Sequence, residues 1–98
     1  MIHGTLDAVT DGISRGEQAF ERAVRRERDA ITLHERAATL HDATAERLDE
    51  ESLAAVDPTD AEALRERAGA ERHLAGLARA RAAGVRARLT AEGVGDTG

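Results

Sequence analysis

Histidine has the widest chemical repertoire of the side chains in this sequence, and two of the four histidines lie seven residues apart. His34 and His41 are therefore two turns apart on the same side of any helix that contains both. Glu71 and Arg67 project into the apolar stripe of a second helical segment, and antiparallel pairing of the two segments brings Glu71 within a turn of His41. Two imidazoles and a carboxylate on facing helices, doubled in a symmetric dimer, could bind a transition metal.

The same residues fit two interpretations without a metal. Polar side chains inside an apolar stripe can form hydrogen-bonded layers that fix helix register and oligomeric state. Because imidazole titrates near neutral pH, the histidines could instead make an interface sensitive to pH. We favour the structural layer, and His34, His41 and Glu71 remain the candidate metal ligands of the alternative.

Known helical metal motifs are incomplete around these histidines. Ferritin-like bundles that bind two metal ions use Glu-x-x-His, but the residue three positions before each of His34, His41 and His73 is apolar. His34-Glu35 begins like the His-Glu-x-x-His motif of zinc metalloproteases, whereas Ala38 stands in place of the second histidine. We therefore expect no cofactor.

Catalytic and nucleic-acid chemistry have little else to build on. The chain has no Cys and no Lys, because all 14 basic residues are Arg, and this excludes thiolate nucleophiles, Schiff bases and a phosphate-loop lysine. Of the two serines, Ser14 fits a helix cap and Ser52 lies in an acidic run. A net charge of −5 and a single aromatic residue argue against nucleic-acid binding. The sequence predicts a protein that is not an enzyme.

One proline divides the chain into two helical arms. Asp57 fits an N-cap and Pro58 a first helical turn, so a second helix is predicted from about 58 to 91. The capping-box pattern from Ser14 to Glu17 predicts a first helix from about 14 to 53, with residues 5–13 either continuing it or forming a separate short helix. A turn at about 54–58 and a flexible, glycine-rich tail at 92–98 complete a single domain, residues 1–98.

Each arm carries apolar residues at spacings of three and four, sustained over several heptads. This pattern is typical of helices that pack as in a coiled coil. The predicted fold class is all-α: a long antiparallel helical hairpin, coiled-coil-like, in which residues whose numbers sum to about 115 lie opposite each other. The residues expected to form its core and dimer contacts are Phe20, Val24, Ile31, Leu40, Leu48, Leu64, Leu74 and Val85.

Large apolar side chains are few in this chain. Alanine supplies 21 residues, against nine Leu, five Val, three Ile, one Met and one Phe. Alanine allows helices to approach closely but buries little area, and the apolar stripes are wider than one partner helix can cover. We therefore expect the hairpin to homodimerise into a four-helix bundle.

The charge distribution suggests how two copies would be oriented. Residues 35–62 carry nine acids and two Arg, whereas residues 63–98 carry seven Arg and four acids. A folded hairpin is therefore acidic at its turn and more basic at its open end. Two such hairpins should dock antiparallel, each acidic end beside the other's basic end.

The N-terminus lacks the pattern of a secretory leader, and no apolar run approaches the roughly 18 residues of a membrane span. We therefore expect a cytoplasmic protein without a membrane partner, although a leaderless export route would leave no such mark. In length, helix number and absence of Cys the chain resembles the WXG100 family of small hairpins exported by type VII secretion. The resemblance is one of shape, because Asp57-Pro58-Thr59-Asp60 stands where that family has Trp-x-Gly, and Trp and Tyr are absent.

The expected function is that of a non-enzymatic scaffold or adaptor, which acts through homodimerisation and contacts with other proteins. A metal-binding bundle and an exported hairpin of the shape just described are the alternatives.

Overall fold

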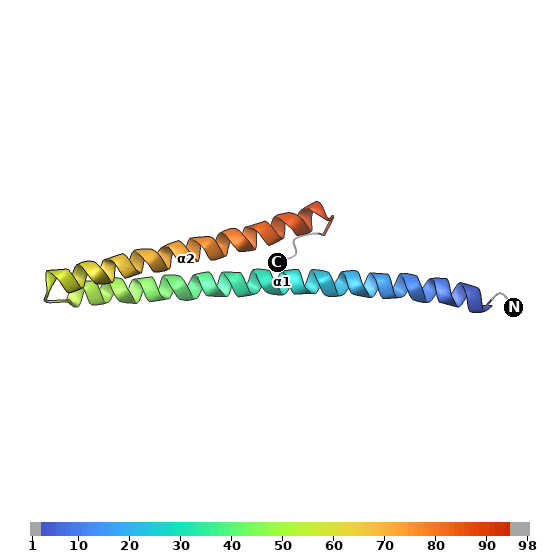
Figure 1. Cartoon of the computed structure of the whole chain (residues 1–98), viewed down its shortest axis with the longest axis horizontal. Coiled ribbons are helices and arrows are strands. Elements are labelled where there is room, and N and C mark those ends of the chain that lie inside the picture. Colours follow the sequence, from blue (N-terminus) through green and yellow to red (C-terminus); the bar gives the residue numbers. More distant parts are fainter. Residues whose placement is uncertain (1–2, 95–98) are drawn as a thin grey trace.

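The chain folds into two long antiparallel helices joined by a short turn (Figure 1). The computed structural model describes the backbone of residues 3–94 and the side chains of residues 12–94. Helix α1 spans His3–Ala54 and helix α2 spans Pro58–Ala91. The molecule is a rod with principal extents of 86 × 20 × 17 Å. The predicted all-α antiparallel hairpin is confirmed.

The turn between the helices is built as the sequence predicts. Asp57 has an extended backbone, and its Oδ1 accepts a hydrogen bond from the Thr59 amide at 2.8 Å. Its carbonyl accepts the first bond of the helix, from the Ala61 amide. Pro58 follows the cap at a position where a backbone N–H would lack a helical partner, so its missing donor costs nothing there. These local bonds fix where α2 begins.

The far end of α2 also has a local cause. Gly93 adopts φ +82°, a conformation that costs glycine little. Its amide donates to the Thr90 carbonyl, and the Val94 amide donates to the Leu89 carbonyl at 2.9 Å. This pair of hydrogen bonds is typical of a helix C-terminus, and it brings Val94 onto the apolar cluster that contains Leu89. The predicted end near residue 91 is confirmed, and the rest of the predicted tail, residues 95–98, lies outside the described residues.

Helix α1 does not begin at Ser14. It continues through Ser14 and Gly16 to His3, so residues 5–13 continue the helix, which is one of the two alternatives that the sequence left open. A glycine in a helix interior costs only about 1 kcal/mol relative to alanine, which a long helix tolerates. At about 1.5 Å per residue α1 is about 78 Å long and α2 about 51 Å. As a result, α1 overhangs the free end of α2 (Figure 1).

The helices meet along a seam in which buried residues recur every seven positions, the spacing that keeps one face toward a partner helix. Val24 shares a cluster with Leu89, and Ala38 shares one with Ala75. In both pairs the residue numbers sum to 113, two less than the predicted sum of about 115. The ten seam residues are Val24, Ile31, Ala38, Ala45 and Ser52 on α1, and Ala61, Ala68, Ala75, Ala82 and Leu89 on α2.

Side-chain size changes along the seam. Toward the turn, alanine faces alanine, with Ala45 and Ala68 in one cluster. Toward the free end of α2, the contact is made by larger side chains, including Val24, Ile31 and Val85. The helices lie close together at the turn and diverge toward that end (Figure 1). The cluster nearest the turn also contains Leu48, with Leu64 packed against it, so large side chains lie between the helices at both ends of the seam.

The predicted core residues divide into two groups. Five of them pack inside the hairpin: Val24, Ile31, Leu48 and Val85 are buried, and Leu64 packs against the cluster nearest the turn. The other three are exposed in the single chain: Phe20, Leu40 and Leu74. Arg67, predicted to project into the apolar stripe, is exposed as well. The buried residues of α2 stand at a seam position or three residues after one. Arg67 instead precedes seam residue Ala68 by one position, and it is therefore exposed.

Candidate functional site

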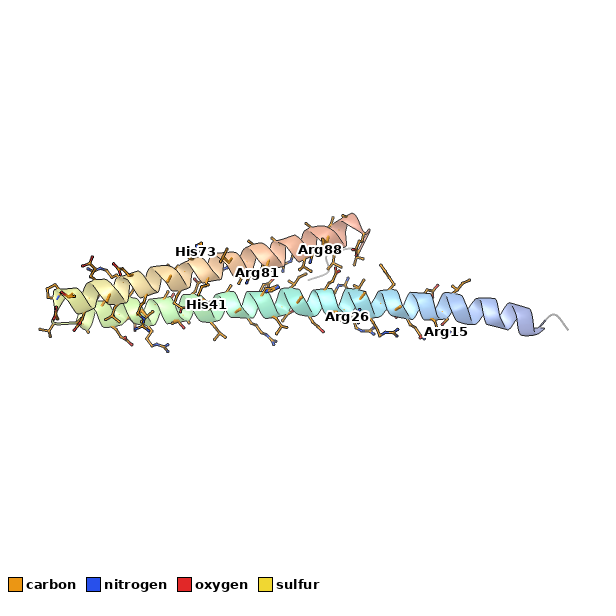
Figure 2. The ribbon with its side chains drawn as sticks, viewed as in Figure 1. Arg15, Arg26, His41, His73, Arg81 and Arg88 are labelled. Atoms are coloured by element: carbon orange, nitrogen blue, oxygen red, sulfur yellow. The ribbon has the colours of Figure 1, made fainter. Side chains whose placement is uncertain are left out.

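A polar layer forms between the helices from one histidine and one glutamate. His41 stands three residues after seam residue Ala38, and Glu71 stands three residues after Ala68, so both side chains face the opposite helix. His41 Nδ1 lies 2.6 Å from Glu71 Oε2, and the two side chains are 34% and 27% exposed. Figure 2 shows His41 on the part of α1 that runs alongside α2. The predicted proximity of His41 and Glu71 is confirmed.

The third candidate metal ligand is not part of this contact. His34 lies one heptad before His41 and is partly buried. Within the described residues, no three His, Cys, Asp or Glu side chains gather closely enough to hold a metal ion. One chain therefore brings together only two of the candidate metal ligands, His41 and Glu71, and the hydrogen bond between them links α1 to α2.

A partly buried glutamate at an equivalent position was not foreseen from the sequence. Glu27 stands three residues after seam residue Val24, as His41 does after Ala38. Its Oε2 atom is buried without a hydrogen-bond partner. A buried oxygen without a partner costs about 1–3 kcal/mol, so Glu27 weakens the hairpin where the two helices diverge.

Three ion pairs run along one flank of the hairpin. Arg72, Arg79 and Arg86 of α2 bind carboxylates of α1, each with its Nη2 atom. Members of the set recur every seven residues on both helices, and the numbers of each pair sum to 121. We call these pairs the ionic ladder: Arg72 with Asp49, Arg79 with Asp42, and Arg86 with Glu35.

The ionic ladder specifies register more than it adds stability. The side chains of Arg79 and Asp42 are 55% and 39% exposed, and an exposed ion pair contributes about 0.2–1 kcal/mol. The hydrogen bond that Arg72 donates to Asp49 raises the pKa of the Arg72 guanidinium. A shift of one residue along the helix would separate all three pairs at once, because they share one register. The ladder therefore disfavours alternative alignments of the helices.

Exposed leucines lie on the opposite flank. On α1, ladder residues follow the seam residue by four positions and the exposed leucines follow it by two, which places them about 160° apart around the helix. Leu33 and Leu40 are 63% and 69% exposed, and Leu74 and Leu77 of α2 are also exposed. We call Leu33, Leu40, Leu74 and Leu77 the leucine flank. Four large apolar side chains on one side of a narrow rod are typical of a surface that another protein covers.

The polar groups of the described residues do not assemble a nucleophile with its base. The Ser52 hydroxyl lies in the seam and donates to the Asp49 carbonyl at 2.7 Å, so it is occupied by the helix backbone. Thr39, on the exposed side of α1, donates in the same way to the Glu35 carbonyl. The chemistry that remains at His41 and Glu71 is that of a hydrogen-bonded link between helices.

Comparison with known proteins does not place the chain in a family. No family model matches the sequence, and no curated protein or solved structure is significantly similar to it. No described helix is both long enough and apolar enough to cross a membrane. Any function must therefore be argued from the hairpin itself.

Proposed function

We propose that this chain is a non-enzymatic cytoplasmic scaffold or adaptor that homodimerises into a four-helix bundle and acts through the surface of that bundle. One observation carries the proposal: alanine fills six of the ten seam positions, while many of the large apolar side chains lie outside the seam. Eight of them are exposed: Ile13, Phe20, Leu33, Leu40, Leu53, Val56, Leu74 and Leu77.

The energetics of the single hairpin support a partner. A fully buried Leu, Ile or Val contributes about 1.5–3 kcal/mol, whereas a buried alanine contributes much less. Seven of the twelve buried hydrophobic residues are alanine. Ordering each residue costs about 1–2 kcal/mol of backbone entropy, which an alanine seam offsets poorly. A second hairpin packed on the exposed leucines would supply the missing apolar contact.

The adaptor role is supported by the overhang of α1. Ile13 and Phe20 lie seven residues apart and exposed, on the stripe of α1 that would face α2 if α2 were longer. Arg15 marks this segment in Figure 2, beyond the free end of α2. An amphipathic helix with apolar residues at such a spacing is a common docking element for other proteins.

Sedimentation equilibrium of the full chain tests the proposal. The expected result is a species of twice the 10.4 kDa chain mass at micromolar concentration, with helicity that rises on association. A single species of one chain mass, at every concentration from micromolar to about 100 times higher, would overturn the proposal. Replacing Ile31 with Asp should abolish both the dimer and most of the helicity, because Ile31 lies in the seam.

A further inference from the structure

The leucine flank contains a second heptad pattern, distinct from the seam. Small residues alternate with leucines at spacings of three and four. On α1 the pattern is kept by Ala30, Leu33, Ala37, Leu40 and Thr44. On α2 the same positions are held by Arg67, Ala70, Leu74, Leu77, Arg81 and Gly84, so an arginine lies on either side of the leucine pair. A helix with two such stripes can pack against one helix through the seam and another through the flank.

We propose that the leucine flank binds a second copy of this chain in antiparallel orientation, about a two-fold axis that passes between Leu33 and Leu40 on α1 and between Leu74 and Leu77 on α2. The inference rests on the homodimer proposed above, and it identifies the contact face and orientation of that dimer. In this arrangement α1 lies along α1 of the second copy, and α2 along its α2.

The two leucine pairs lie at the same level along the rod. A two-fold axis across the hairpin must cross both helices at one level, because it is a single straight line. The midpoint between Leu33 and Leu40 falls at residue number 36.5. The midpoint between Leu74 and Leu77 falls at 75.5, so the two numbers sum to 112. His41 and Glu71, which are in direct contact, also sum to 112. Both leucine pairs are therefore centred at the same level.

On α1 the two-fold axis pairs small and apolar residues with each other. About this axis Leu33 packs against Leu40 of the second copy, and Ala30 against Thr44 of the second copy. Ala37 lies next to the axis and meets its own symmetry mate. No charged side chain interrupts the flank of α1 between Ala30 and Thr44. The centre of the contact is thus small and apolar, as a close helix contact requires.

On α2 the same axis pairs each arginine of the flank with a small residue. Leu74 meets Leu77 of the second copy, Arg81 meets Ala70, and Arg67 meets Gly84. A Cβ built on Gly84 contacts nothing within 4 Å in the single chain, so there is room for a side chain to lie across it. The aliphatic part of each arginine can cover the small residue while its guanidinium stays in water.

The charges at the two ends of the hairpin favour the antiparallel orientation. The turn end, residues 43–70, carries eight acids and three Arg. The open end, residues 20–33 and 80–92, carries seven Arg and four acids. Figure 2 shows Arg26 on α1 and Arg81 and Arg88 on α2 toward that end. Antiparallel docking places each acidic end beside a basic end, whereas parallel docking places the two acidic turns together.

One contact between like charges falls within this arrangement. Arg26 lies near Arg47 of the second copy, but Glu50 and Glu51 follow Arg47 within one helical turn. The net charge near Arg26 in the second copy is therefore negative, which favours Arg26 there. All of these groups stand at the solvent-exposed ends of the contact.

The flank is large enough for a stable dimer. The paired part of the hairpin is about 51 Å long, and the rod is 17–20 Å across. Its flank therefore offers on the order of 900 Å² per copy, close to the roughly 800 Å² per partner of a standard interface.

A matched pair of substitutions tests the face. Leu40→Glu places a charge at the centre of the leucine flank, and Leu53→Glu places the same charge at an exposed leucine of α1 outside it. Leu40→Glu counts twice in a symmetric dimer, so the dimer dissociation constant should rise by a factor on the order of 100 or more. Leu53→Glu should change it by a factor of less than about 3. Helicity at high protein concentration, measured by circular dichroism, shows that both variants fold.

Cysteine cross-linking tests the orientation, since the natural chain has no cysteine. Ala37→Cys alone should form a disulfide between copies, because a residue beside the axis meets its own symmetry mate within the few ångströms that a disulfide spans. Ala30→Cys alone should not, because the two copies of residue 30 lie about 14 residues, or about 21 Å, apart along the rod. An equal mixture of Ala30→Cys and Thr44→Cys should cross-link.

The outcomes separate this inference from the proposed function. A dimer that Leu40→Glu leaves intact, or a mixture of Ala30→Cys and Thr44→Cys that fails to cross-link while the dimer persists, overturns the face or the orientation and leaves the homodimer standing. A chain that is monomeric at all concentrations overturns the proposed function, and this inference with it.

Discussion

Enlarging one alanine of the seam gives the sharpest test of how the two helices pack. Ala75 is fully buried and shares a cluster with Ala38, which is 1% exposed. Leucine at position 75 would add three carbon atoms at a point where the helices approach closely. Filling extra apolar volume gains about 0.8 kcal/mol per buried methylene only if the helices separate to admit it. Such a separation would disturb the neighbouring contact of Ala45 with Ala68.

The expected effect of Ala75→Leu is a net loss of stability. Overpacking a well-packed contact costs about 1–3 kcal/mol. For a chain of about 100 residues, each kcal/mol lowers the Tm by about 4–8 °C, so the Tm should fall by roughly 5–20 °C. The matched control is Ala80→Leu, at an exposed position of the same helix. Alanine and leucine differ little in helix propensity, so the control should change the Tm by less than about 2 °C.

Thermal unfolding followed by circular dichroism measures both variants, at one protein concentration because association shifts the apparent Tm. The reasoning is refuted if Ala75→Leu melts at or above the temperature of the natural chain while Ala80→Leu is unchanged. That result would mean that the seam has room for a large side chain, and that the helices are held apart by something other than their alanines.

Three further changes probe single features of the hairpin by chemical denaturation. Gly93→Ala should lower the free energy of unfolding by about 1 kcal/mol because residue 93 has positive φ. Gly69→Ala, in an open helical position, should instead raise it by about 0.5–1 kcal/mol. Equal effects of the two substitutions would contradict the assignment of Gly93 as the helix terminator. Glu27→Leu should raise it by about 1 kcal/mol or more by removing a buried oxygen without a partner, and a loss of stability would show that the carboxylate is satisfied. A double-mutant cycle of Arg79→Ala and Asp42→Ala should give a coupling of about 0.2–1 kcal/mol that fades in 1 M salt, and a coupling insensitive to salt would count against an exposed ion pair.

The ends of α2 were predictable because their causes are local. Asp57 and Pro58 start the helix through bonds within a few residues, and Gly93 ends it through its own backbone conformation. The start of α1 was not predictable in this way. The capping-box pattern at Ser14 is one local preference worth about 1 kcal/mol, and continuation of a long helix through Ser14 and Gly16 outweighs it.

The two polar features between the helices differ in how far the sequence could predict them. The contact of His41 with Glu71 follows from helix periodicity and an approximate register, because both residues project toward the facing helix. The ionic ladder required knowledge of which flank each charge occupies and a register accurate to about one residue. The signal was present as carboxylates and arginines repeated every seven residues, but the sequence also offers other arginines in α2 as partners.

The structure changes the argument for a dimer by dividing one broad apolar stripe into two surfaces. The sequence placed Ile31, Leu40 and Leu74 together among the residues expected to form the core and dimer contacts. In the hairpin, Ile31 lies in the seam, while Leu40 and Leu74 lie outside it on the leucine flank. Leu40 follows seam residue Ala38 by two positions, and Leu74 precedes seam residue Ala75 by one. These two leucines are therefore exposed because of their positions around the helices, on the surface that the proposed second copy would cover.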